Sequence, residues 1–443
     1  MASKPLATEP LPRAQLSLLD LLCLGINAIV GSGIYAFPGL LAAMLGPASF
    51  IPFLCCGAIS LLIALCFADA ASRYPHSGGP YVYARAAFGS GFGFVVGWSC
   101  WAAAVLSWAA VTRALLPYLG QLIGNSLDAS AIWIALGTTA ALGLLNVFGI
   151  KPGAYLTDLL TVAKLAPLLL LGAVGLPALR RRRLVPLAPH GWHGLPNATF
   201  LAFFAFQGFE VVGVPASESR NPKRAVPIAT IGAVSFATLL YVVVQLVAVG
   251  TQDQLAGSKD PLALVAKTLL GDFGSRLVAF AALVSMVGFC SGVALASPRY
   301  LEPLAADGLL PSWLAARHRR LATPHRAIII TTGCAALLVL ALDFRALVDL
   351  SVTTVALQYL ATCAAVLRFR GRRSSAPAAS YRLPAGPLIP LLSLALVILM
   401  FLAQLTSAGR TATPLLWGFL LLNLVGAALG GSYWLWRRLT PPA

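Results

Sequence analysis

Apolar stretches of roughly 20 residues, the length that an α-helix needs to cross a bilayer, recur from residue 17 almost to the end of this chain. Hydrophobic residues make up 59% of its 443 residues and charged residues only 10%. Such proportions do not describe a soluble surface. The sequence therefore predicts an all-α membrane protein that leaves no room for a soluble domain.

The apolar spans, together with the polar, proline- or arginine-containing breaks between them, predict about twelve transmembrane helices. The first span is too long for the apolar core of a signal peptide, so we expect it to be retained as helix 1. Most of the eight cysteines lie inside apolar spans and have the character of small packing residues. The expected helices lie near residues 17–44, 48–70, 92–118, 130–149, 155–177, 198–217, 227–250, 276–298, 327–343, 346–368, 387–406 and 413–436.

The chain carries 31 Lys and Arg against 14 Asp and Glu, a formal net charge of +17. Because these positive charges sit in short loops between apolar spans, they indicate topology rather than nucleic-acid binding. With both termini in the cytoplasm, 20 basic residues fall inside and 10 outside, while Lys164 stays in the membrane. The run of arginines at 180–183 falls outside and conflicts with this orientation, which we keep.

Two of the expected helices are interrupted near mid-membrane. Helix 1 contains Gly31, Ser32, Gly33 and Pro38, and helix 6 reads FFAFQGFE over residues 203–210. Backbone left unpaired at that depth is tolerated only around a cavity. Two interrupted helices that lie five helices apart suggest an inverted five-plus-five repeat.

A broken helix offers free N–H groups at the start of one half and free C=O groups at the end of the other half. The amides attract a carboxylate and the carbonyls attract an ammonium, and an amino acid carries both groups on one carbon. Breaks in two neighbouring helices can therefore hold the head of an amino acid without any charged side chain. The alternative is that Gly31 and Gly33 only allow close helix packing.

Several stretches, in order along the chain, resemble the amino acid-polyamine-organocation transporters. Residues 31–35 (GSGIY) look like the helix 1 signature of that family, and residues 74–83 (YPHSGGPYVY) resemble its first cytoplasmic loop. Residues 204–210 with 218–227 (ESRNPKRAVP) resemble helix 6 and the loop after it, and residues 306–311 (ADGLLP) follow helix 8. The resemblance covers most of the chain.

The resemblance implies a LeuT-like fold with helices 1 and 6 broken, in which helices 1, 2, 6 and 7 move against helices 3, 4, 8 and 9. It divides the chain into a cytoplasmic tail (1–16), two five-helix repeats (17–180 and 181–370), and helices 11 and 12 with a cytoplasmic C-terminus (371–443). It implies a secondary transporter of amino acids in the cell membrane, taken as a bacterial inner membrane. Such a protein works by alternating access, is not an enzyme and uses no cofactor, and its partners are the amino acid and the lipid bilayer.

Carried onto this sequence, the family pattern puts the substrate carboxylate at the amides of Ser32 and Gly33. The substrate ammonium then meets the carbonyl groups of Ile29, Phe204 and Gln207. The residues that this pattern brings to the substrate head are Ile29, Gly31, Ser32, Gly33, Phe204, Gln207 and Gly208.

The pocket for the substrate side chain is expected to draw on Ser99, Cys100 and Ala104 of helix 3 and on Ser291 and Val293 of helix 8. Helix 3 is similar to the arginine/agmatine antiporter at Cys100, but Ala104 stands where that antiporter has an asparagine and Val293 stands where it has a tryptophan. A guanidinium would find neither an amide nor an aromatic face there. A neutral, small or apolar side chain is favoured, and a cationic amino acid or a polyamine is the alternative.

Lys164 lies roughly ten residues into helix 5, about 15 Å by the helical rise, too deep for its ammonium to reach the membrane surface easily. In related sodium-independent transporters a helix 5 lysine lies against the helix 1 break, where sodium-coupled relatives bind an ion. If Lys164 releases its proton, transport is proton-coupled. If it stays charged, it is a fixed brace in an exchanger or uniporter. A further alternative is that it lines an unrelated water-filled cavity.

Glu210 follows the helix 6 break, and a carboxylate in the membrane is costly enough to be functional. It either carries a proton or accepts hydrogen bonds from the unwound backbone, and we favour the second. Phe204, where related transporters have an aromatic gate, and Tyr35 complete the gating candidates, although Phe204 could simply face lipid. Asp69, near the cytoplasmic end of helix 2, has the character of a loop anchor.

Two other classes of membrane protein were weighed against a transporter. A membrane enzyme would need clustered acids for a metal, or a nucleophile with its base, at a membrane face. The five histidines show no pairing with cysteine at ligand spacing. A channel would not need paired breaks or occluding gates, so the sequence favours a transporter.

Overall fold

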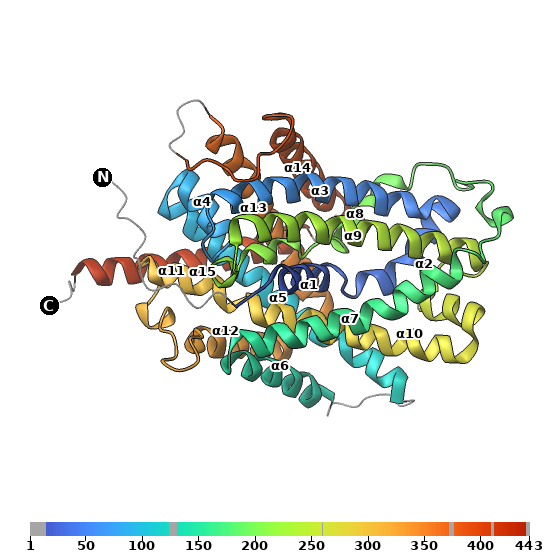
Figure 1. Cartoon of the computed structure of the whole chain (residues 1–443), viewed down its shortest axis with the longest axis horizontal. Coiled ribbons are helices and arrows are strands. Elements are labelled where there is room, and N and C mark those ends of the chain that lie inside the picture. The colour runs from blue at the N-terminus through green and yellow to red at the C-terminus, as the bar shows by residue number, and fades with distance from the viewer. Residues whose placement is uncertain (1–14, 124–130, 259, 372–375, 409–411, 440–443) are drawn as a thin grey trace.

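The computed structural model describes residues 15–123, 131–258, 260–371, 376–408 and 412–439. Regular structure in these ranges is helical, apart from an isolated β-bridge between Leu16 and Ser219 (Figure 1). The α-helices are α1 (Leu18–Ile29), α2 (Gly33–Leu45), α3 (Phe50–Arg73), α4 (Pro80–Phe88), α5 (Ser90–Ile123), α6 (Ala131–Val147), α7 (Ile150–Gly175), α8 (Leu195–Phe204), α9 (Pro222–Thr251), α10 (Pro261–Ala296), α11 (Pro298–Ala306), α12 (His325–Ala341), α13 (Phe344–Phe369), α14 (Leu388–Ala408) and α15 (Ala412–Leu439). Short 3-10 segments join them at η1 (Gly46–Ser49), η2 (Arg181–Leu184), η3 (Phe209–Gly213), η4 (Ala216–Glu218) and η5 (Ser312–Leu314).

The described residues contain seven helical stretches that are long and apolar enough to cross a membrane, and shorter apolar helices besides. The seven are Gly33–Arg73, Ser90–Leu116, Ile150–Gly175, Leu195–Gly213, Pro222–Thr251, Pro261–Ala306 and Phe344–Phe369. The shorter ones are Leu18–Ile29, Ala131–Val147, His325–Ala341, Leu388–Leu402 and Trp417–Tyr433. Each of the twelve expected spans coincides with helical segments, while the number of membrane crossings stays a prediction.

Some helix boundaries differ from the expected ones. α10 begins at Pro261 rather than near residue 276, because two helical pieces meet at a kink at Gly271, where φ is +67° and ψ is −160°. The short helices α4 and α11 were not expected as separate elements. They begin at Pro80 and Pro298, and proline suits a first helical turn because that turn needs no N–H donor.

The helices of each of the two sets that the resemblance implies are in contact with one another, and contacts also join the two sets. α9 packs against α1 and α3, and α8 packs against α2 and α3. In the second set α5 and α6 both pack against α10 and α12. α7 lies along α10, and α13 lies along α5. The inverted repeat that would relate the two halves of the chain stays a prediction.

Figure 1 shows α4 and α11 at one end of the molecule and the loop that carries η2 at the other end. Basic residues assigned to the inside, such as Arg85 on α4 and Arg299 on α11, therefore lie opposite the arginines at 180–183. Arg183 forms an ion pair with Asp253, which offsets part of the charge that conflicted with the proposed orientation. The orientation itself stays a prediction.

Asp69 has the anchoring role that its position indicates. Its buried carboxylate accepts hydrogen bonds from Arg73 at 2.6 Å and from Arg370 at 3.1 Å. Arg73 ends α3 and Arg370 follows α13, so these bonds fasten the two helices together at this end of the molecule.

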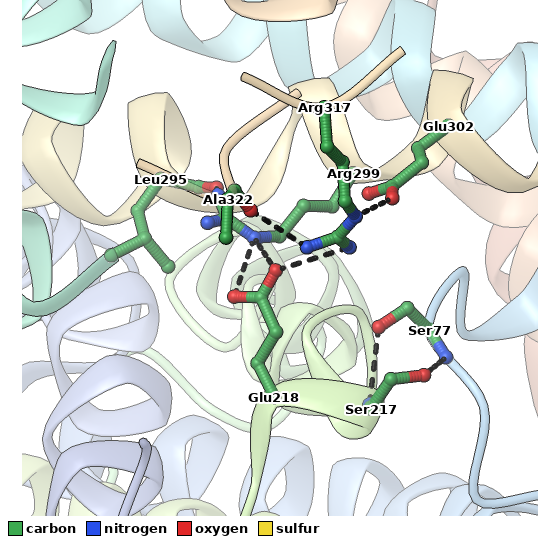
Figure 2. A network of polar contacts seen from close by, with 8 residues as sticks. All are labelled: Ser77, Ser217, Glu218, Leu295, Arg299, Glu302, Arg317 and Ala322. Carbon is green, nitrogen blue, oxygen red and sulfur yellow. Dashed lines mark hydrogen bonds and ion pairs between the residues drawn. The ribbon is translucent and has the colours of Figure 1, made fainter. Parts of the chain in front are cut away.

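A buried polar network lies beside α11 (Figure 2). Glu218 at the end of η4 accepts hydrogen bonds from Nε of Arg299 at 3.1 and 3.2 Å and forms an ion pair with Arg317 at 3.6 Å. Arg317 also forms an ion pair with Glu302 at 2.5 Å. The Arg299 and Glu218 side chains are only 1% and 4% exposed, so each charge depends on its partners rather than on water.

The loop that carries Glu218 is tied to two other segments. The amides of Ser77 and Ser217 each donate to the hydroxyl oxygen of the other residue, at 2.8 and 3.1 Å (Figure 2). The amide of Leu16 donates to the carbonyl of Glu218 at 2.9 Å, and the amide of Arg220 donates to the carbonyl of Leu16 at 3.0 Å. The loop after the broken helix is therefore fixed on both sides.

Replacing Glu218 by alanine is expected to lower the thermal unfolding midpoint strongly, because Arg299 would keep a buried charge without its main partner. Breaking a buried ion pair from one side costs about 3–5 kcal/mol. The control is Lys267→Ala, which breaks the exposed pair of Lys267 with Asp272 and should cost less than about 1 kcal/mol. Equal midpoints for the two purified variants would contradict this account.

Candidate functional site

The first helix break lies between α1 and α2. α1 ends at Ile29 and α2 begins at Gly33, so residues 30–32 lie outside regular helix. The first amides of a helix have no partner within that helix, and the side chain of Ser32 caps none of them. The start of α2 therefore presents N–H groups and the positive end of a helix dipole in the interior of the protein.

The second break follows α8, which ends at Phe204. Residues 205–208 form turns, and the chain continues as the 3-10 segment η3 from Phe209 to Gly213. Gly208 has a φ of +120°, a conformation that only glycine adopts readily. A Cβ at this position would also collide with the carbonyl oxygen of Ala28, so the break requires a glycine here for two reasons.

The two breaks pack directly against each other. A Cβ at Gly33 would lie 2.7 Å from the Cβ of Ala205, so this glycine allows the start of α2 to approach the end of α8. A Cβ at Gly31 would lie at an ordinary 3.5 Å from Phe289. Close packing therefore explains Gly33 but not Gly31. The helix is also interrupted at residues 30–32, so close packing is not the whole role of this segment.

Both breaks line one cavity of about 70 Å³. Its polar side is the backbone of the two breaks, and α5, α10 and α13 supply alanine, valine and phenylalanine side chains to the other side. Among the described residues that line the cavity, Glu210 is the only one with a carboxylate and none has a basic side chain. The cavity thus combines a dipolar backbone surface with a mainly apolar wall.

Glu210 is 5% exposed and its carboxylate is occupied by hydrogen bonds within the protein. One oxygen accepts from the amide of Gly208 and from the hydroxyl of Tyr359, both at 2.9 Å. The other oxygen accepts from the amide of Gln358 at 3.4 Å. The side chain therefore contacts the unwound backbone, which is the geometry of the second of the two expected roles.

Lys164 is fully buried and its ammonium donates to the carbonyl groups of Asn27 at 2.7 Å and Val30 at 2.5 Å. It lies against the end of α1 and does not line the cavity. Its ammonium therefore lies against the helix 1 break, where the resemblance to the family places it. Its charge sits at the negative end of the α1 dipole, where a cation is favoured.

Two hydroxyl groups from neighbouring helices lie against further carbonyls of the first break. Ser285 of α10 donates to Val30 at 3.0 Å and to Gly31 at 3.2 Å. Tyr241 of α9 lies within hydrogen-bond distance of the carbonyls of Ile29 at 2.9 Å and Ala205 at 3.1 Å, so it joins the two breaks. Most of the carbonyl groups left by the interruption thus have partners from neighbouring helices.

Residues 16–426 match the model of the family described as amino acid permease. The chain belongs to the amino acid permease family. This match over nearly the whole chain confirms the resemblance to the amino acid-polyamine-organocation transporters that the sequence motifs indicate.

The permease has curated relatives in animals and bacteria. It is 30% identical to mouse cationic amino acid transporter 4 over 401 residues, which are 85% of this chain but only 62% of the mouse protein. It is 27% identical to the branched-chain amino acid permease BcaP of Bacillus subtilis over 409 residues, covering 88% and 87% of the two chains. It is also 27% identical to the methylthioribose transporter of Bacillus subtilis over 403 residues, covering 85% and 86%.

Most of the expected site residues of the permease meet around the cavity. They come from the two breaks and from the facing sides of α5 and α10. Those that line it are Ile29, Gly31, Ser32, Gly33, Cys100, Ala104, Phe204, Gln207, Gly208, Glu210 and Val293. The ring of Phe204 lies edge-on to Phe37 of α2, with centroids 6.0 Å apart, and borders the cavity instead of facing lipid alone.

Besides Lys164, three expected residues lie away from the cavity. Ser99 is next to Cys100 but points to α15, where its hydroxyl donates to Asn423 at 2.7 Å. The hydroxyl of Ser291 lies 3.1 Å from that of Thr157 on α7. Tyr35 is buried in α2 outside the lining. Successive residues of a helix point about 100° apart, so being one residue along a helix is enough to move a side chain out of the site.

The largest omission from the expected site is α13. This helix lines the cavity with residues three or four positions apart, which is the spacing of one helical face. These residues are Phe344, Val348, Ser351, Val355 and Gln358. Gln358, a polar side chain that would be costly against lipid, is the residue of this face that the sequence could have singled out.

Replacing Gly208 by alanine is expected to destabilise the permease by about 1–3 kcal/mol through the backbone conformation alone, with the collision at Ala28 in addition. The matched control is Gly137→Ala on α6, because a Cβ at Gly137 meets nothing within 4 Å. Thermal unfolding of both purified variants measures the difference. An unchanged midpoint for Gly208→Ala would mean that the break does not need a glycine.

Proposed function

We propose that this permease is a secondary transporter of neutral L-amino acids that works by alternating access without sodium. The observation that supports the proposal is the pair of helix breaks that line one cavity. The start of α2 supplies amides there, and the end of α8 supplies carbonyl groups. A carboxylate and an ammonium on one carbon match such a pair of dipoles. The apolar wall opposite them suits the side chain of the amino acid.

In the proposed binding mode the substrate carboxylate meets the amides of Ser32 and Gly33 at the start of α2. The carbonyl of Ile29 already accepts hydrogen bonds from Tyr241 and from the amide of Gly31 at 2.8 Å. These contacts make the carbonyl of Ile29 less available to the substrate. The substrate ammonium is left to the carbonyls of Phe204 and Gln207, and the ring of Phe204 covers the site.

A neutral side chain fits the lining better than a cationic one. Ala104 and Val293 face the cavity, and neither can hydrogen-bond a guanidinium or an ammonium. Glu210 could attract a cation, but its oxygens already accept bonds from Gly208, Tyr359 and Gln358. A cationic amino acid remains the second candidate because the mouse relative carries the name of a cationic amino acid transporter.

Lys164 supports transport without sodium, because its ammonium occupies the carbonyls of Asn27 and Val30 that a metal cation would otherwise bind. Two modes of coupling follow from this geometry. Release of the Lys164 proton during the cycle would couple transport to protons, and a permanently charged Lys164 would brace an exchanger or uniporter. Uptake measured with and without an imposed pH gradient separates the two modes.

We further propose that residues 17–180 and 181–370 are the two repeats, since each includes one broken helix. Alternating access would then move α1, α2, α3, α8 and α9 against α5, α6, α10 and α12. The end of the molecule that carries α4 and α11 would face the cytoplasm, together with both termini, in a bacterial inner membrane. Residues 371–443 would add helices outside the repeats.

Reconstitution into proteoliposomes tests the proposed function. We expect saturable uptake or exchange of a labelled small neutral amino acid, with the L-enantiomer favoured because three substituents of the α-carbon meet different surfaces. Competition by arginine or a polyamine but not by neutral amino acids would support the cationic alternative. Absence of saturable, stereoselective transport for every standard amino acid would overturn the proposal.

Lys164→Ala is expected to lower the transport rate at least about tenfold. The substitution removes two hydrogen bonds from a charged donor, each worth about 1.5–3 kcal/mol, and leaves the end of α1 without its cation. Lys267→Ala, which removes an exposed lysine from α10, serves as the control and should transport normally. Uptake by Lys164→Ala at the rate of the unmodified protein, across external pH, would show that the lysine is dispensable.

A further inference from the structure

We propose that Asn27 is a positioning residue of the transport cycle, whose side chain fastens the broken end of α1 to α10 and so holds the carbonyls that Lys164 binds. This inference rests on the proposed transport function. Asn27 is 0% exposed and does not line the cavity. Its contribution to transport therefore comes through other residues and not through contact with the substrate.

Asn27 connects three helices at one point. Its side-chain amide donates to the carbonyl of Gly288 on α10, and its own main-chain carbonyl accepts from Lys164 on α7 at 2.7 Å. The residue lies in the last turn of α1, before the break at residues 30–32. A shift of its side chain therefore also moves a carbonyl to which the buried ammonium is bound.

The surface of α10 leaves room for this side chain at two glycines. A Cβ at Gly288 would lie 2.8 Å from Oδ1 of Asn27, and a Cβ at Gly292 would lie 2.9 Å from its Nδ2. The two glycines are four residues apart and so lie on one face of α10. Any larger residue at either position would displace the amide from the carbonyl that it contacts.

The same face of α10 also contacts the break between α1 and α2. Ser285, one turn before Gly288, donates to the carbonyls of Val30 and Gly31, and Val30 is also bound by Lys164. Asn27 and Ser285 thus fix α1 to α10 on the two sides of the last helical turn. Without the Asn27 amide, α1 would lose its hydrogen bond to Gly288, and the bonds of Ser285 to Val30 and Gly31 would remain.

This arrangement predicts an effect on rate rather than on affinity. In the proposed cycle α1 and α10 belong to groups of helices that move relative to each other, so the Asn27 contact belongs to the conformation described here and must be remade in every cycle. The backbone that binds substrate begins beyond Asn27, at the break. Loss of the contact should slow the cycle and leave the substrate affinity nearly unchanged.

The test compares exchange of a labelled small neutral amino acid by proteoliposomes that carry Asn27→Leu, Asn27→Ala, Gly292→Ala or the double variant. Leucine keeps the branched shape of asparagine without the hydrogen bond, so it separates bonding from packing. We expect each single variant to lower the maximal exchange rate per folded protein about tenfold, equivalent to about 1.4 kcal/mol. The KM should change by less than about twofold.

The double variant Asn27→Ala with Gly292→Ala tests whether the effect of Gly292→Ala acts through the Asn27 side chain. Alanine at position 27 vacates the space that the Gly292 Cβ would enter, and the next atom lies at an ordinary 3.5 Å. The double variant should therefore be no slower than Asn27→Ala alone. Gly333→Ala on α12, where a Cβ meets nothing within 4 Å, is the control and should exchange normally.

Rates like those of the unmodified protein in the Asn27 variants, or losses that multiply in the double variant, would overturn the inference. So would variants that yield less folded protein but exchange normally per folded molecule, because that is a purely structural role. If the unmodified protein transports nothing, the proposed function fails instead. The contact of Asn27 with α10 is then judged from non-additive unfolding midpoints of the same variants.

Discussion

The need to satisfy backbone polar groups away from water governs this structure. Interrupting two helices in the membrane leaves carbonyl and amide groups that lipid cannot satisfy. Lys164, Ser285 and Tyr241 take up carbonyls of the first break, and Glu210 accepts from an amide of the second. At the first break the protein leaves the first turn of α2 available, and residues of that turn line the cavity together with Phe204 and Gln207 of the second break. The proposed binding surface is thus the part of the broken backbone that the fold has not already paired.

Close approach of the two breaks explains why glycine stands at particular positions. Gly33 and Gly208 let two interrupted backbones meet, and Gly288 with Gly292 lets the end of α1 reach α10. Each contact is made by backbone against backbone or by a side chain fitted into a glycine gap. Such contacts have few alternative geometries, because the packed interior around them cannot deform smoothly. In the proposed transport cycle, a change in the position of α1 would therefore alter several of these contacts together.

The sequence indicated the breaks and the buried lysine because each contrasts with its surroundings. A glycine pair, a lysine or a glutamate in an apolar span is costly enough to require a reason, and the reason is local. The wall of α13 was missed because Val348 and Val355 look the same whether they face lipid or a cavity. Ser99 and Ser291 were misplaced because the rotation of a helix is set by its neighbours, here Asn423 and Thr157. Hydropathy finds helices, but it does not tell which side of a helix faces the site.

The division of labour around the cavity follows from these facts. In the proposed binding mode, backbone amides and carbonyls bind the carboxylate and the ammonium of the substrate. Because every residue type has these backbone groups, this part of the site depends on backbone conformation rather than on side-chain chemistry. The wall is made by side chains of α5, α10 and α13, and among these Gln358 also donates to Glu210. Glu210 belongs to both parts of the site, because it lines the cavity and also accepts a hydrogen bond from the amide of Gly208 in the second break. A cationic substrate that bound the Glu210 carboxylate would remove its hydrogen bond to the amide of Gly208. Glu210 is the lining residue that could favour a cationic side chain, and it is also the residue on which the second break depends.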